Sequence, residues 1–201
     1  MKRLIIFVLL TILLSSCSKA SNPDQALYEG PPKDLLLQSE DLPGAYLLME
    51  ELSGQKPNES LKMNSEEPQA LEQYLERTGR IAGWENHFML IEPTQTLPGF
   101  ILNQAVVYES AVGAQNALNW PSVQVRETVE NDRIIGDAMT LTMIPFNAPD
   151  NSAWIDYRVE FTYKNLLGAI STFSPEMVAK PDYALDLAEL LFQQFENTLN
   201  P

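Results

Sequence analysis

The fold is decided by the stretch IDYRVEFTYK, residues 155–164, in which apolar and polar side chains alternate without a break. Successive side chains of a β-strand point to opposite sides of the sheet, so this pattern predicts a strand with one buried face and one solvent-exposed face. The dipeptide Lys164-Asn165 then predicts a turn into a second strand over residues 166–173. We therefore expect an antiparallel hairpin here.

The segment after this hairpin has the repeat of an amphipathic helix. Pro181 can open the helix, and apolar residues follow three or four apart along one side: Ala184, Leu187, Ala188, Leu191, Phe195 and Leu199. A helix of this length can cover a sheet.

Further strands are predicted before the hairpin. Residues 84–91 and 100–109 form two of them, and Pro98-Gly99 between them is typical of a turn. Another strand is indicated by the alternation of Met139, Leu141 and Met143 with threonines, and residues 45–52 predict a further one.

Two more helices are predicted between these strands. Ser65 can cap a helix that ends at Gly79, and Ser110 can cap a short one that ends before Trp120-Pro121. The polar segment 54–67 is typical of an exposed loop. The sequence therefore predicts an α+β fold, in which an antiparallel meandering sheet carries helices on one face, including the amphipathic C-terminal helix.

The N-terminus has the pattern of an export signal. Lys2 and Arg3 precede an apolar run over residues 4–14, which as a helix would cover only about half of a hydrocarbon core about 30 Å thick. The segment Leu14-Ser15-Ser16-Cys17 follows at once and resembles the lipobox of bacterial lipoproteins.

This resemblance implies cleavage between Ser16 and Cys17, with a thioether-linked diacylglycerol on Cys17 and, in many bacteria, a third acyl chain on the freed amine. Two or three acyl chains make a lasting membrane anchor, whereas one is marginal. Cys17 is the single cysteine of the chain, which excludes an intramolecular disulfide. Ser18 in place of an aspartate implies the outer membrane in a didermic host, and otherwise the protein would lie on the outer face of the cell membrane.

Composition divides the chain into three parts. Residues 1–16 are the signal peptide, residues 17–33 are rich in Ser, Asn, Pro and Gly and predict a lipid-anchored flexible tether, and residues 34–201 are of the size of a single domain. Without residues 1–16 the chain has 11 basic and 27 acidic side chains, a net charge of −16. Such a charge excludes nucleic acid as a partner, because phosphate binding needs an excess of Lys and Arg.

A second resemblance extends over most of the predicted domain. It rests on four segments, Asp41-Leu42-Pro43-Gly44, Gly79-Arg80-Ile81, Tyr108-Glu109-Ser110-Ala111 and Ile135-Gly136-Asp137. With the hairpin and terminal helix that follow, they resemble uncharacterised exported bacterial lipoproteins, and the order of elements is similar to the α-β-α sandwiches of the PsbP and Mog1 type. That resemblance implies an accessory or binding protein and identifies no functional residue.

The search for chemistry gives few candidates. His87 is the single histidine and lies within a predicted strand, which favours a structural or solvent-facing residue over a catalytic base. Adjacent acids on a strand point to opposite sides, and acids at a helix start are expected from the dipole, so these pairs indicate little: Glu40-Asp41, Glu50-Glu51 and Glu66-Glu67. We predict no catalytic, cofactor-binding or metal-binding residue.

Two possible binding sites stay open. The loop at residues 147–152, with Asp150 and Asn151, and the turn from Glu130 to Asp132 could offer oxygens to Ca²⁺. Six aromatic residues are expected mainly in the core but could line a site: Trp84, Trp120, Trp154, Tyr74, Tyr108 and Tyr157.

The sequence thus predicts a lipid-anchored extracytoplasmic lipoprotein that serves as a non-catalytic binding or accessory module of the cell envelope. Its partner would be an envelope protein or a small apolar ligand between helices and sheet. The alternative is an extracytoplasmic hydrolase or metal-dependent enzyme that uses carboxylates.

Overall fold

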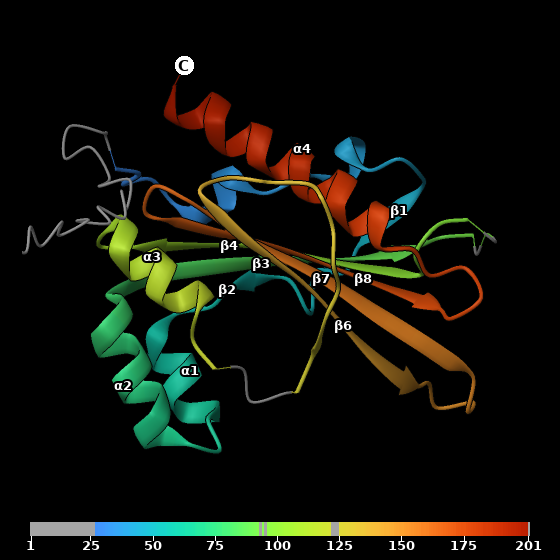
Figure 1. Cartoon of the computed structure of the whole chain (residues 1–201), viewed down its shortest axis with the longest axis horizontal. Helices are drawn as coiled ribbons and strands as arrows, with labels where there is room; N and C mark the ends of the chain where they lie inside the picture. Colours follow the sequence, from blue (N-terminus) through green and yellow to red (C-terminus); the bar gives the residue numbers. More distant parts are fainter. Residues whose placement is uncertain (1–26, 93, 95, 122–124, 201) are drawn as a thin grey trace, which may run out of the picture.

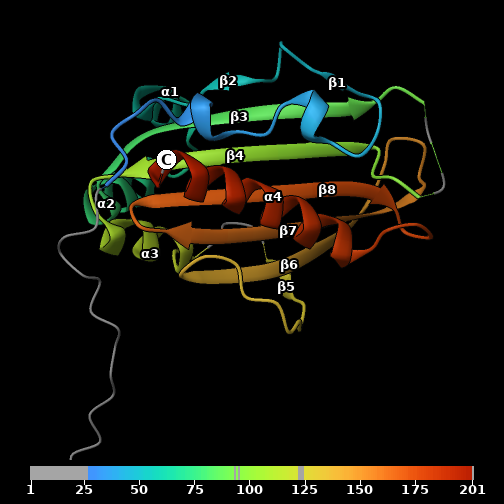
Figure 2. The same cartoon turned by 90° about the horizontal axis from the view of Figure 1, so that it is seen from above.

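The computed structural model describes residues 27–92, 94, 96–121 and 125–200, and within them the chain forms one antiparallel eight-stranded sheet (Figures 1 and 2). The strands run across the sheet in the order β1-β3-β4-β8-β7-β6-β5, and β2 also pairs with β3. Their bounds are β1 Tyr46–Leu48, β2 Gly54–Gln55, β3 Arg80–Leu90, β4 Phe100–Tyr108, β5 Glu127–Thr128, β6 Ala138–Asn147, β7 Ala153–Tyr163 and β8 Leu166–Pro175. The predicted α+β class with an antiparallel meandering sheet is confirmed.

The predicted hairpins are also confirmed. β7 turns back into β8 through Lys164, which takes a left-handed conformation at φ 54°, and Val159 lies opposite Ile170 in the register. β3 and β4 pair in the same antiparallel way on either side of Pro98-Gly99. These four strands form the middle of the sheet.

The C-terminal helix α4 (Pro181–Leu199) crosses one face of the sheet over β7 and β8 (Figure 1). The apolar side predicted for it faces the sheet, where Leu191 and Phe195 are completely buried. Two short 3-10 helices, η1 (Pro32–Leu35) and η2 (Ser39–Asp41), lie nearby. Leu35 at the end of η1, and Leu36 and Leu37 between the two helices, are buried in the same core. The main hydrophobic core therefore lies between α4 and the sheet.

Helices also pack on the opposite face, so the prediction that they cover only one face is wrong. There α3 (Ala111–Leu118) buries Ala114 against Val106 and Leu167, beside α1 (Asn58–Asn64) and α2 (Pro68–Thr78), as Figure 1 shows below the sheet. The strand β4 has apolar side chains at odd and even positions, so it can be covered on both sides.

The polar side of β7 is largely covered as well, which corrects the prediction of a solvent-exposed face. Thr162 is completely buried and Asp156 is 7% exposed. Arg158 and Glu160 are half-buried and hydrogen-bond to each other. Strict alternation marked the strand correctly. Arg158 and Glu160 can be covered because they hydrogen-bond to each other, whereas Thr162 Oγ1 has no hydrogen-bond partner among the described residues.

The structure modifies three further local predictions. The strand predicted at residues 45–52 is shorter, because Met49 to Ser53 forms a turn after β1. The predicted loop at residues 54–67 contains β2 and α1. Ser65 ends α1, while α2 begins only at Pro68, although Gly79 ends it in a left-handed conformation as expected.

The first buried residue of the described chain is Tyr28, within the segment predicted as a tether. Its backbone N–H donates to Asn165 Oδ1 over 2.8 Å, and Asn165 Nδ2 donates back to its carbonyl oxygen over 2.9 Å. The chain therefore joins the domain at the β7–β8 turn. The predicted signal peptide, with its predicted cleavage site between Ser16 and Cys17, lies outside the described residues.

Candidate ligand-binding pocket

A pocket of about 510 Å³ opens on the face of the sheet opposite α4. It lies at the end of the sheet away from the β7–β8 turn, and five neighbouring strands, β3, β4, β8, β7 and β6, contribute to its lining. Thirteen residues line it: Met49, Leu52, His87, Phe88, Phe100, Ile101, Leu102, Phe146, Asn147, Ala148, Pro149, Trp154 and Phe173. Apolar side chains dominate the lining, so the pocket favours apolar groups.

The strand register brings its aromatic rings together. Phe100 on β4 lies opposite Phe173 on β8, and Trp154 on β7 lies opposite Phe146 on β6. Because positions two apart in a strand share a face, these four side chains point to the same side of the sheet. Gly99 lets Trp154 lie close to the backbone, since a Cβ at this glycine would come within 3.0 Å of the indole.

The rings form a connected cluster. The ring centroids of Phe100 and Trp154 are 6.2 Å apart, and Phe146 is 6.3 Å from both Trp154 and Phe173. The angles between ring planes range from 41° to 76°, so the rings meet in tilted and edge-on arrangements. Phe146 is 37% exposed and stands at the pocket's edge.

A strip of polar side chains crosses the sheet beside the pocket. His87 Nε2 is 3.4 Å from Glu85 Oε2, and Lys56 Nζ is 3.3 Å from the same oxygen. Gln104 Nε2 donates to Glu85 Oε1 over 2.9 Å and its Oε1 accepts from Arg158 over 3.0 Å. The strip is therefore a continuous hydrogen-bonded network rather than a set of free groups.

A nearly buried ion pair continues this strip towards the sheet edge. Arg126 Nη2 lies 2.7 Å from Asp156 Oδ2, and both side chains are 11% exposed. Arg126 Nε also donates to Thr142 Oγ1 over 2.9 Å. The pair fastens the segment before β5 to the sheet, while Asp156 Oδ1 has no hydrogen-bond partner among the residues that the structure describes.

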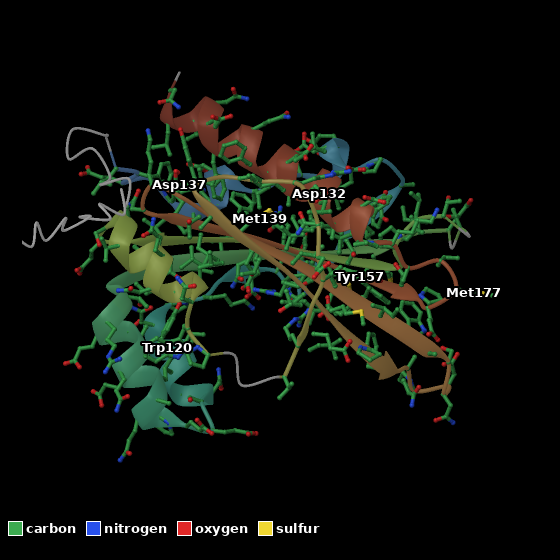
Figure 3. The ribbon with its side chains drawn as sticks, in the orientation of Figure 1. Trp120, Asp132, Asp137, Met139, Tyr157 and Met177 are labelled. Atoms are coloured by element: carbon green, nitrogen blue, oxygen red, sulfur yellow. The ribbon has the colours of Figure 1, made fainter. Side chains whose placement is uncertain are left out.

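A second, more polar cavity of about 880 Å³ lies between the end of α3 and the strands β5 and β6. Tyr74 and Trp120 meet edge-on at its wall with ring centroids 5.4 Å apart, and Figure 3 labels Trp120 beside the α-helices. Its lining includes Pro121 and Val125, and residues 122–124 between them lie outside the described part of the chain. We therefore place the candidate site at the first pocket.

The residues that the sequence left open as site candidates lie in different parts of the molecule. His87 lines the pocket, as does Trp154, whereas Trp84, Tyr108 and Tyr157 belong to or pack against the core. In the loop that could offer oxygens to Ca²⁺, Asp150 Oδ1 accepts hydrogen bonds from the backbone N–H and the hydroxyl of Ser152.

The acidic pairs do not converge on one place. Asp41 Oδ2 accepts the Gln38 N–H at the start of η2, and Glu66-Glu67 precedes α2. Glu50-Glu51 lies in the turn between Met49 and Leu52, at the pocket wall. In the described parts of the chain, no three side chains of His, Cys, Asp or Glu gather closely enough to hold a metal ion. The helices described there include none that is long and apolar enough to span a membrane.

Sequence reasoning missed the phenylalanines of the pocket. Phe100, Phe146 and Phe173 lie on β4, β6 and β8, which are not consecutive along the chain. The order of the strands in the sheet brings these residues together. One signal in the sequence could have indicated the pocket. Phe100 and Leu102 occupy even positions of β4, and apolar side chains at these positions indicate that this face of the strand is not fully exposed to water.

Comparison with known proteins identifies no family and a distant structural similarity. The chain matches no family model and no curated protein. The extracellular domain of PknH from Mycobacterium tuberculosis is similar in structure, with a TM-score of 0.48 and 10% sequence identity over 82% of this chain and 94% of that chain. A likeness this distant says nothing of function.

Proposed function

We propose that this chain is a lipid-anchored extracytoplasmic lipoprotein, and that its domain is a non-catalytic binding module which holds a small apolar ligand in the aromatic pocket. The pocket is the observation that carries the binding part. Its volume of about 510 Å³ falls in the range of small-molecule sites, about 300–1,000 Å³, and its lining is mostly apolar. The anchor rests on the signal-like N-terminus and on the lipobox-like segment that ends at Cys17.

The same pocket gives little support to a hydrolase that uses carboxylates. General acid–base chemistry needs a proton donor or acceptor within hydrogen-bond reach of the substrate. His87 is the one titratable side chain among the lining residues, and its ring contacts Glu85. An apolar group that enters the pocket would therefore meet mainly hydrocarbon and aromatic rings.

Binding can be tested on a soluble chain that begins at Ser18. Every described strand and helix lies after Tyr28, so we expect this chain to fold without the leader. The neutral dye N-phenyl-1-naphthylamine should bind saturably, and Phe146→Ala should weaken its binding by about fivefold, because the ring is lost from the pocket wall. Leu190→Ala is the matched control, because Leu190 on α4 is 39% exposed and lies on the other face.

Absence of saturable dye binding, or equal weakening by both substitutions, would contradict the pocket. Turnover of ester, glycoside or phosphate substrates that is lost in His87→Ala would contradict the non-catalytic role. Mass spectrometry of the protein from its own host tests the anchor, since we expect a diacylglycerol on Cys17 and no residues 1–16. A free thiol or an intact leader would refute that part alone.

A further inference from the structure

Charge around the pocket is strongly unbalanced. The segments that form or flank it are residues 46–56, 85–92, 97–104, 144–156 and 173–177, and together they contain seven carboxylates and a single lysine. Two further cations, Arg126 and Arg158, reach the same face from neighbouring segments. The carboxylates are Glu50, Glu51, Glu85, Glu92, Asp150, Asp156 and Glu176. Surfaces lined by one sign of charge raise the local concentration of ligands of the opposite sign.

The cations on this face are already engaged. Lys56 lies 3.3 Å from Glu85, Arg126 lies 2.7 Å from Asp156, and Arg158 lies 2.9 Å from Glu160. An anionic ligand head would have to break one of these pairs and leave a carboxylate unpaired in a partly covered site, which is costly. The pocket therefore disfavours fatty-acid-like anions.

Exposed carboxylates stand on two opposite walls. Glu50 and Glu51 lie in the turn between the lining residues Met49 and Leu52, and Asp150 directly follows the lining residue Pro149. The two hydrogen bonds from Ser152 lower the pKa of Asp150, so this carboxylate stays charged at neutral pH. A positive group at the mouth of the pocket would face acids on both sides.

The rings inside the pocket suit the same ligand. An aromatic face attracts cations, and tryptophan does so most strongly. Trp154 sits between Phe100 and Phe146 in the ring cluster. We propose that the pocket binds an amphipathic organic cation, with its apolar body inside the pocket and its positive group at the mouth, between the acidic rim and the aromatic rings at the pocket's edge. This inference rests on the proposed function and specifies its ligand class.

Three probes with the same six-carbon chain separate charge from hydrophobicity: hexyltrimethylammonium, 1-hexanol and hexanesulfonate. Their binding to the chain that begins at Ser18 can be measured by displacement of N-phenyl-1-naphthylamine. We expect the cation to bind at least about threefold more tightly than the alcohol, and the sulfonate to bind most weakly. The advantage of the cation should shrink between about 0.01 M and about 1 M salt, where the screening length falls from about 30 Å to about 3 Å.

A charge-matched pair of variants locates the effect. Glu50→Gln, Glu51→Gln and Asp150→Asn together should remove most of the preference for the cation and leave hexanol binding unchanged, since all three side chains are exposed. The control is Glu66→Gln, Glu72→Gln and Glu76→Gln, which removes the same charge at and within α2 and should keep the preference.

The outcomes distinguish the preference for a cation from the existence of the binding pocket. Equal binding of the three probes, tightest binding of the sulfonate, or a cation preference that survives in the rim variant would overturn the cation inference but leave the pocket as a binding site. Failure of the dye and of every probe to bind would overturn the proposed pocket itself.

Discussion

Replacement of Arg126 by methionine should destabilise the domain by about 3 kcal/mol. The Coulomb attraction across the 2.7 Å between Arg126 and Asp156 is about 6 kcal/mol at an effective dielectric constant of about 20. Desolvation of both groups offsets much of this attraction. The substitution leaves the Asp156 carboxylate covered and unpaired, because its other oxygen has no partner in the described part of the chain either. Loss of one member of such a pair typically costs about 3–5 kcal/mol, and the residual 11% exposure places this case at the lower end.

Urea unfolding followed by circular dichroism measures this cost, and a drop in Tm of roughly 6–12 °C should accompany it for a domain of this size. A second substitution, Asp156→Asn, should restore much of the loss when it is combined with Arg126→Met, since the unpaired charge is then removed. Asp182→Asn is a control that breaks an exposed contact with Arg133 and should cost less than about 1 kcal/mol. If Arg126→Met costs no more than this control, water screens the pair and the polar face is not closed as described.

Three further predictions concern stability. Gly113→Ala should cost about 3 kcal/mol or more in urea unfolding, because the new Cβ would overlap the carbonyl oxygen of Thr78, whereas Val112→Ala on the same helix should be nearly neutral. Phe161→Ala removes a completely buried ring beneath α4 and should cost about 3–5 kcal/mol, and a value below about 1 kcal/mol would contradict the packing. Burial raises the pKa of Tyr108 well above its ordinary value, so the folded chain keeps a proton that the unfolded chain loses above about pH 10. Stability should therefore fall as pH rises from about 10 to about 12, and Tyr108→Phe should reduce this fall, as urea midpoints at both pH values would show.

The strands and the last helix could be predicted because each has a local repeat. The alternation in residues 155–164 gave β7 correctly, and apolar spacing from Ala184 to Leu199 gave the buried side of α4. Turn residues such as Lys164 and Gly79 marked element ends, since both adopt left-handed conformations. These signals depend only on neighbours within a few residues.

What lies on each face of the sheet could not be predicted in this way. Asp156 and Thr162 look like solvent-facing residues in the sequence, yet their partners or cover come from α3, β6 and the segment around Arg126, which are distant along the chain. The pocket has the same origin, because Phe146 and Phe100 meet Trp154 only after four strands have paired. The site depends on the order of the strands in the sheet, and this order is difficult to predict from a single sequence.

The link between Tyr28 and Asn165 has a geometric consequence for the proposed anchor. Eight residues of strand, about 26 Å, separate Asn165 from Phe173, so the chain from Cys17 joins the domain at one end while the aromatic pocket opens near the other. With lipid on Cys17, as proposed, the joined end is tied towards the bilayer and the mouth samples the aqueous space beyond it. Because the predicted tether is flexible, the pocket is not held at the membrane surface, so dissolved compounds can reach its mouth without passing through the leaflet.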